Sequence, residues 1–182
     1  MTHYEKQLDR QEIYDGKVFH VVRDKVELEN GHTSYREVVY HHGGACIAAL
    51  TDQDEIYMVR QFRYSFMEEL WELPAGKLEL NEDPFDAARR ELGEECGLTA
   101  DKFTDLGVVY PTVGYCSEKI YTWAATGLHE CDMHLDPDEF LTPVKVPFQK
   151  ALDMVLSGEI KDGKTVFAIL KIQTLRQMGK EL

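Results

Sequence analysis

The chain has 182 residues, 43% of them hydrophobic, and a formal net charge of −13. This length fits one globular domain with a sizeable core, and an acidic excess of this size repels phosphate backbones and anionic lipids. We therefore expect neither nucleic acid nor a membrane surface as a partner. An anionic phosphate ligand would need a bound divalent cation to overcome the field.

The cysteines and the N-terminal residues indicate the compartment. Cys46, Cys96, Cys116 and Cys131 form no C-x-x-C pair, so we predict neither a zinc knuckle nor a redox dithiol. Free thiols are typical of a reducing compartment. Residues 1–10 are polar where a signal peptide would be apolar, and no apolar run approaches the roughly 18 residues of a membrane span. These features predict a cytoplasmic protein.

The first third of the chain predicts antiparallel strands. Residues 17–27 and 33–40 carry valines on either side of the turn signal Glu29-Asn30-Gly31, as expected for a hairpin. The apolar run 45–50 predicts a buried strand, and residues 55–62 predict another. Further strands are expected at 106–110, 119–125 and 143–147, and helices at 148–156 and 165–178. Strands followed by late helices indicate an α+β or mixed α/β domain.

The clearest helix spans residues 84–96. Asp83 is a favourable N-cap, Pro84 suits the first helical position, and Gly97 suits the position after the last turn. One stripe of this helix is apolar and is expected to face the core. It consists of Phe85, Ala88, Leu92 and Cys96.

Three carboxylates share the helix face beside that stripe. Glu91 and Glu95 are one turn apart, and Glu94 lies next to them. Like charges at this spacing repel one another unless a cation intervenes, and oxygen ligands without histidine or cysteine favour Mg²⁺ or Mn²⁺ over zinc. A solvated acidic face paired with Arg89 and Arg90 is the alternative, and helix geometry alone does not separate the two.

Residues 76–98 match the pattern G-x5-E-x7-R-E-U-x-E-E-x-G-U, with U aliphatic, at every specified position. On these residues the chain resembles the Nudix hydrolases. The resemblance implies a loop-helix-loop that binds divalent metal and cleaves a nucleoside diphosphate linked to another group. It also implies an α+β (mixed α/β) fold, an α/β/α sandwich, to which this chain adds an N-terminal antiparallel sheet.

The resemblance gives each charged residue of the pattern a role. Glu91 and Glu95, with Glu94 in support, correspond to metal ligands. Glu82 corresponds to an accessory glutamate, and Arg90 to the residue that orients the carboxylates. Bound Mg²⁺, for which Mn²⁺ could substitute, would offset the local acidic excess, lower the pKa of the attacking water and neutralise the diphosphate. No covalent protein nucleophile is then required.

The segments before this pattern extend the resemblance to the ADP-ribose pyrophosphatase group. They are R-Q-F-R at residues 60–63 and E-L-W-E-L-P-A-G at residues 69–76. The resemblance implies that the backbone carbonyl of Ala75 is a metal ligand, that Arg63 contacts the diphosphate, and that Glu72 assists substrate or metal. Arg60 is a second predicted substrate-binding residue. A guanidinium suits bidentate phosphate contact, although Arg63 could also be an ordinary surface strand residue.

One departure from the group concerns the substrate. The group usually carries S-P-G shortly after the signature, whereas this chain has Thr112-Val113-Gly114. We predict hydrolysis of ADP-ribose to AMP and ribose 5-phosphate. GDP-mannose or a UDP-sugar is the alternative substrate, and a nucleotide-sensing module that does not hydrolyse is the alternative function. The intact Glu91, Glu94 and Glu95 argue against such a module.

The general base of the family usually lies on an acidic loop before the last strand. Glu139 is the best match, and Asp136 and Asp138 are rivals on the same loop. A carboxylate on a closing loop could take the proton from the attacking water. An ordinary solvated loop is the alternative.

A second motif occurs at residues 158–165, which satisfy the phosphate-binding pattern G-x-x-x-x-G-K-[ST]. A true P-loop follows a buried strand, whereas this segment follows the predicted helix 148–156. Too little chain remains after Thr165 to complete a P-loop sheet. We therefore predict a helix C-cap and a loop between two helices.

The N-terminal region is expected to form a separate part of the molecule. We predict a β extension at residues 1–42, which would contribute to a homodimer interface by resemblance, and a Nudix hydrolase domain at residues 43–182. In the resembling group, aromatic side chains of the N-terminal strands stack on adenine. Phe19 and Tyr35 are the corresponding candidates, and core packing is the alternative for both.

Overall fold

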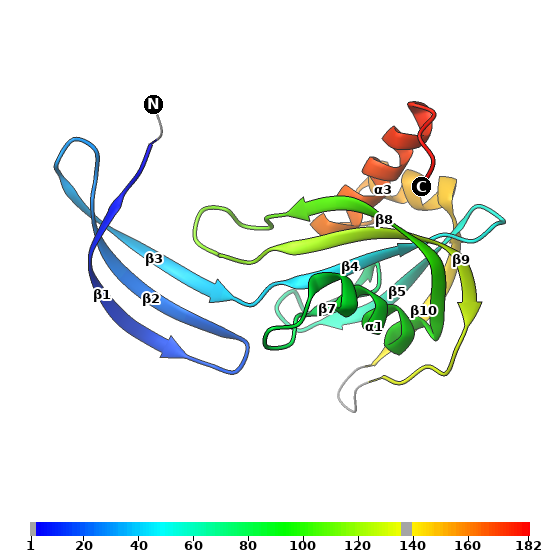
Figure 1. Ribbon diagram of the computed structural model, residues 1–182, viewed down its shortest axis with the longest axis horizontal. Coiled ribbons are helices and arrows are strands. Elements are labelled where there is room, and N and C mark those ends of the chain that lie inside the picture. The colour runs from blue at the N-terminus through cyan, green and yellow to red at the C-terminus, as the bar shows by residue number, and fades with distance from the viewer. Residues whose placement is uncertain (1–2, 136–139) are drawn as a thin grey trace. The chain divides into compact units, whose positions relative to one another are not determined.

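The structure is a computed structural model that describes residues 3–135 and 140–182. Its backbone divides into two compact units (Figure 1). The smaller unit contains Met1–Gly43 and Tyr110–Lys119, and the larger contains Gly44–Val109 and Ile120–Leu182. Residues 110–119 therefore belong with the N-terminal unit, although the sequence did not place them there. In the part of the chain that is described, no helix is long and apolar enough to cross a membrane.

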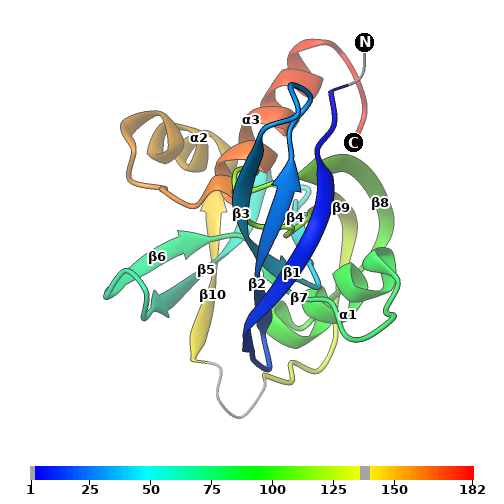
Figure 2. The same cartoon turned by 90° about the vertical axis from the view of Figure 1, so that its left-hand side faces the viewer.

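The smaller unit is built on a three-stranded antiparallel sheet in the order β1-β2-β3 (Figure 2). Its strands are β1 (Lys6–Asp15), β2 (Phe19–Glu27) and β3 (Thr33–His41). The predicted hairpin is confirmed as β2 and β3, and Gly31 in their connection has a φ of 80°, which favours glycine. Val22 and Val26 of β2 are buried.

Strand β1 was not predicted from the sequence, because its residues are mostly polar and every one of them is exposed. Its pairing with β2 brings Arg10 against Asp24, whose carboxylate accepts hydrogen bonds from Arg10 Nε at 2.8 Å and Nη2 at 2.7 Å. These hydrogen bonds hold the pKa of Asp24 below its ordinary value, although Asp24 is buried. The strand therefore depends on its partner strand and not on an apolar pattern of its own.

The larger unit contains two sheets. A four-stranded sheet has the order β7-β4-β9-β8, and a three-stranded sheet has the order β10-β5-β6. Strands β4 and β9 run parallel, and the other pairs are antiparallel. The strands are β4 (Gly44–Ala49), β5 (Glu55–Arg63), β6 (Glu68–Glu72), β7 (Ala75–Lys77), β8 (Leu98–Val109), β9 (Ile120–Glu130) and β10 (Leu141–Pro147).

Helix α1 (Pro84–Cys96) has the predicted bounds and caps. Asp83 accepts a hydrogen bond from the Phe85 backbone N–H at 2.8 Å, and Gly97 takes the left-handed conformation at φ 62°. Of the predicted apolar stripe, Phe85 remains 38% exposed and packs edge to face against Phe103. Its other members, Ala88, Leu92 and Cys96, are buried.

Helices α2 (Phe148–Ser157) and α3 (Gly163–Gln177) close the chain. Figure 1 shows α1 and α3 on opposite sides of β4 and β9. The apolar residues accordingly form two clusters: Ala45, Ile47 and Ala49 of β4 pack with α1, while Cys46, Ala48 and Leu50 pack with α2 and α3. Since successive side chains of a strand point to opposite faces, β4 is buried on both sides. The structure is thus the mixed α+β sandwich with an added N-terminal antiparallel sheet that the sequence predicted.

Candidate active site

The acidic face of α1 is organised around one arginine. Arg90 Nη1 donates hydrogen bonds to Glu91 Oε1 at 2.7 Å and to Glu94 Oε2 at 2.8 Å. Its Nε and Nη2 donate to the two carboxylate oxygens of Glu82, at 2.8 and 3.0 Å. These bonds lower the pKa of Glu82 and raise that of Arg90. One guanidinium therefore brings together three of the predicted carboxylates, two from the helix and one from the loop before it.

The remaining helix carboxylate faces strand β7. Glu95 is buried, and its Oε2 accepts a hydrogen bond from the Ala75 backbone N–H at 2.8 Å. Strand β7 also approaches Glu91: a Cβ added to Gly76 would lie 1.9 Å from Glu91 Oε1. The lack of a side chain at Gly76 is what leaves room for the Glu91 carboxylate against the strand. The structure thus places Glu91, Glu95 and the backbone of Ala75 side by side.

This arrangement suits a hard divalent cation. Glu91 and Glu95 are both buried, so their carboxylates are largely shielded from solvent. Carboxylate and carbonyl oxygens are the ligands that Mg²⁺ and Mn²⁺ prefer. Within residues 3–135 and 140–182, no three side chains of histidine, cysteine, aspartate or glutamate form a ready-made metal cluster. Arg90 instead pairs with Glu91 and Glu94.

A second charged group lies at the ends of β5 and β6. Arg63 Nε and Nη2 donate to Glu72 Oε1 and Oε2, both at 2.6 Å, in a bidentate pair. Burial raises the pKa of Glu72, but the hydrogen bonds from Arg63 and the nearby charge of Lys164 outweigh it, and the pKa lies below its ordinary value. The Arg63 side chain is 38% exposed. The side chain is therefore only partly covered, and Glu72 pairs with Nε and Nη2 of its three guanidinium nitrogens.

The sequence did not single out Lys164 as part of this group. Its Nζ lies 2.5 Å from Glu72 Oε2 and 3.0 Å from Asp162 Oδ2, and its side chain is only 9% exposed. The signal was present, because Lys164 is the lysine of the G-x-x-x-x-G-K-T match. The predicted account of that match is confirmed: Gly158 caps α2, and Asp162 caps α3 by accepting a hydrogen bond from the Thr165 N–H.

Comparison with known proteins shows which family the chain belongs to. The sequence profile of the NUDIX domain matches residues 40–166, well over half of the chain. The chain belongs to the Nudix family. The predicted enzyme class, a Nudix hydrolase acting on phosphoric anhydride bonds, is confirmed at this level. Nudix hydrolases generally use divalent metals, which agrees with the buried carboxylates of Glu91 and Glu95.

Three named proteins are similar in sequence to this chain over most of its length. The chain is 40% identical to an ADP-ribose pyrophosphatase of Bacillus subtilis (strain 168), over 93% of this chain and 92% of that protein. It is 37% identical to a methanol dehydrogenase activator of Bacillus methanolicus, with the same coverage. It is 34% identical to a GDP-mannose pyrophosphatase of Yersinia pestis (strain Pestoides F), over 74% of this chain and 72% of that protein.

A solved structure shares the fold. The crystal structure of an ADP compounds hydrolase superposes with a TM-score of 0.84, covering 97% of each chain, at 21% sequence identity. The Nudix-type fold predicted from the signature is therefore confirmed.

Some residues predicted for the Nudix site take part in none of the contacts described above, or lie outside the described chain. Arg60 has other partners: it donates to Glu69 Oε2 at 2.5 Å and lies over the Trp71 ring. Phe19 and Tyr35 are on the N-terminal sheet, where both are exposed. The predicted base lies outside the described residues, as do its two rivals. These three are Glu139, Asp136 and Asp138.

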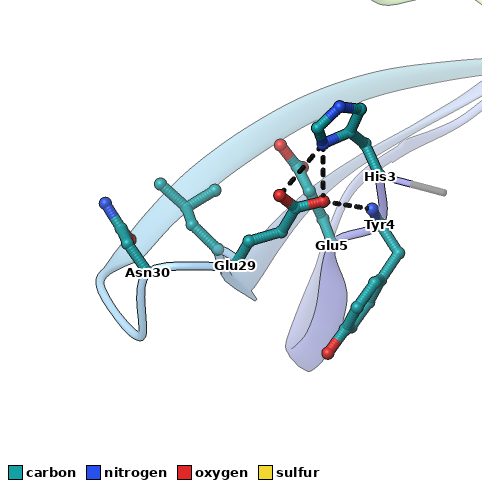
Figure 3. A pocket seen from close by; sticks show the side chains of 6 residues that line it. His3, Tyr4, Glu5, Glu29 and Asn30 are labelled. Atoms are coloured by element: carbon teal, nitrogen blue, oxygen red, sulfur yellow. Dashed lines mark hydrogen bonds and ion pairs between the residues drawn. The ribbon is translucent and has the colours of Figure 1, made fainter. Parts of the chain in front are cut away.

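One hollow in the described chain is lined by none of the residues of the Nudix signature. It has a volume of about 610 Å³ and lies on the N-terminal unit. Figure 3 shows Glu29 in its wall, with both carboxylate oxygens 3.0 Å from His3 Nδ1 and one of them accepting from the Tyr4 N–H. Glu5 contributes a second carboxylate. Two carboxylates there disfavour a diphosphate, and no residue of the signature lines the hollow.

Proposed function

We propose that the protein hydrolyses the diphosphate linkage of ADP-ribose, or of a similar nucleoside diphosphate sugar, with Mg²⁺ as its natural cofactor. The observation that carries this proposal is the contact of the α1 carboxylates with β7, where Glu95 binds the Ala75 N–H and Glu91 fills the space beside Gly76. The names of the Bacillus subtilis and Yersinia pestis relatives support the substrate class. With ADP-ribose, water adds across one phosphoanhydride bond and the products are AMP and ribose 5-phosphate.

Glu91, Glu95 and the Ala75 carbonyl would hold the metal, with Glu94 in support. When bound, the metal neutralises diphosphate charge and makes water more acidic; Mn²⁺ could replace Mg²⁺. Arg90 has a separate role, because its ion pairs fix the positions of Glu82, Glu91 and Glu94 before any ligand arrives. Such preorganisation reduces the rearrangement needed at the moment of reaction.

Substrate recognition is assigned to the arginines. Arg63 would use the part of its guanidinium that Glu72 leaves open to bind the diphosphate, since a guanidinium matches phosphate oxygens in a fork geometry. Arg60 is 48% exposed and could contact a more distant part of the substrate. Glu139 is our proposed base, to take a proton from the attacking water, with Asp136 and Asp138 as rivals.

A substrate panel tests the proposed function. The protein is incubated with Mg²⁺ and separately with ADP-ribose, GDP-mannose, a UDP-sugar, a dinucleoside polyphosphate or ATP, and the products are separated by chromatography. We expect AMP and ribose 5-phosphate from ADP-ribose, with a kcat/KM about tenfold or more above that for the other compounds. A higher kcat/KM for GDP-mannose than for ADP-ribose would make GDP-mannose the preferred substrate, which is still a nucleoside diphosphate sugar. No turnover of any diphosphate compound would favour a nucleotide-sensing module instead.

We also propose that residues 1–42 are a dimerisation extension of a Nudix hydrolase domain at residues 43–182, and that the protein is a homodimer. Strand β1 supports this, because it forms one edge of its sheet and exposes Leu8, Ile13 and Tyr14. Sheet edges with exposed apolar side chains favour association. The predicted cytoplasmic location and the absence of a nucleic-acid partner stay predictions.

Light scattering coupled to gel filtration tests the dimer. We expect a mass near twice the 21.0 kDa of one chain at micromolar concentration, and an Ile13→Lys variant shifted towards the monomer because a charge on the strand opposes its burial. The exposed Lys161→Met variant is the control and should keep the wild-type mass. A wild-type mass of one chain would refute the homodimer.

A further inference from the structure

The start of α3 carries three polar residues to which the proposed function gives no role. They are Asp162, Lys164 and Thr165. The left-handed C-cap of α2 explains Gly158 of the G-x-x-x-x-G-K-T match. The turn between α2 and α3 does not explain why the Lys164 side chain is buried. An ammonium group removed from water is unfavourable unless carboxylates compensate it, so its position calls for a specific partner.

That partner is Glu72. Lys164 Nζ donates to Glu72 Oε2 at 2.5 Å, the same oxygen that accepts from Arg63 Nη2 at 2.6 Å. Burial lowers the pKa of Lys164, but the nearby charges of Asp162 and Glu72 raise it by more. The pKa therefore lies above its ordinary value, and the ammonium remains charged. Glu72 is therefore held between two cations that come from different parts of the chain, and Arg63 is held by Glu72.

Further hydrogen bonds fix the position of Asp162 and of the segment that carries Glu72. Asp162 Oδ2 accepts from the Thr165 backbone N–H at 3.1 Å and from Thr165 Oγ1 at 2.6 Å, and it lies 3.0 Å from Lys164 Nζ. Thr165 Oγ1 in turn accepts from the Leu73 backbone N–H at 2.8 Å. Leu73 follows Glu72 directly in the chain. The first turn of α3 is thus bonded to both the backbone and the side chain of the segment that holds Arg63.

We infer that Lys164 is a positioning residue for substrate binding: through Glu72 it fixes the Arg63 guanidinium so that its open side faces the diphosphate. This inference rests on the proposed function, in which Arg63 binds that diphosphate. Lys164 itself does not touch the substrate, because its ammonium is enclosed by Glu72 and Asp162. Its effect is therefore exerted on ground-state and transition-state binding alike.

The Lys164→Met variant tests the inference, since methionine has a similar length and no charge. We expect the KM for ADP-ribose to rise about tenfold and kcat to change less than about threefold, which is the signature of lost uniform binding. The Lys161→Met variant is the matched control. Lys161 lies three residues earlier and pairs with Glu68, but it is exposed at the surface, so its KM should stay within about twofold of wild type.

A double variant separates positioning from simple stabilisation. In an Arg63→Ala background, Lys164→Met should raise KM no further than about twofold, because residues that act through one another are not additive. Asp162→Asn is the second route, since asparagine keeps the helix cap while it removes one anchor of Lys164. We expect its KM to rise about threefold. This variant decides the matter if Lys164→Met does not fold.

The outcomes distinguish the inference from the proposed function. Absence of wild-type turnover of ADP-ribose would overturn the proposed substrate and, with it, the role of Arg63. Wild-type turnover together with an unchanged KM in the folded Lys164→Met and Asp162→Asn variants would overturn only the inference. A fully additive rise in KM in the Arg63→Ala background would overturn it as well. A lower melting temperature with an unchanged KM would leave Lys164 a purely structural residue.

Discussion

The Glu95→Gln variant is expected to lose about a thousandfold in kcat for ADP-ribose while keeping its fold. Glutamine has nearly the same shape, and its side-chain oxygen can still accept the hydrogen bond that the Ala75 N–H donates to Glu95 Oε2 at 2.8 Å. It lacks the negative charge that a divalent cation needs. A metal contributes several kcal/mol of charge stabilisation in the transition state, and about 4 kcal/mol corresponds to a thousandfold in rate.

Three measurements check this expectation: product formation by chromatography, thermal unfolding, and Mn²⁺ binding by calorimetry. Glu79→Gln is the matched control, since Glu79 lies in the same signature region but is exposed. Its kcat and Mn²⁺ affinity should match those of the wild type. Unimpaired turnover by Glu95→Gln would mean that the metal is bound elsewhere.

The Gly76→Ala variant is expected to lower kcat by about a hundredfold or more. The added methyl group would lie 1.9 Å from Glu91 Oε1 and 2.1 Å from Glu91 Cδ. The carboxylate sits at the end of a flexible side chain, so it moves away and the fold survives. A displacement of about 1 Å in a catalytic group can cost about a hundredfold in rate. The Mn²⁺ affinity should fall in parallel.

Gly163→Ala provides the comparison for this substitution. A Cβ at Gly163 meets no atom within 4 Å, and the residue begins α3, where alanine favours the helix. We expect wild-type kcat and an equal or slightly higher melting temperature. If Gly76→Ala also kept wild-type kcat and Mn²⁺ affinity, Glu91 would not be a ligand that depends on the space beside β7.

The net charge of −13 affects which anionic ligands can approach this site. Part of the acidic excess lies on α1 and the loop before it, where Arg90 offsets only some of the charge of Glu82, Glu91 and Glu94. A bound divalent cation would offset more and allow a small diphosphate to enter. Long polyanions would still meet the remaining negative field.

Much of the molecule could be predicted from the sequence because the information is local. The bounds of α1 follow from Asp83, Pro84 and Gly97, each of which acts within one helical turn. The signature at residues 76–98 predicted the family, the fold class and the enzyme class, all of which are confirmed. The β2 and β3 hairpin followed in the same way from its turn signal and the valines on either side of it.

The tertiary structure decided what depends on partners far along the chain. Strand β1 is mostly polar, and it forms because β2 supplies its hydrogen bonds. The short strands β6 and β7 are too brief to have a pattern of their own. Lys164 and Glu72 are 92 residues apart. Only the folded structure therefore shows that this lysine of the first turn of α3 is buried beside the proposed diphosphate site. Local sequence determines caps, turns and signatures, whereas long-range packing determines which charges meet.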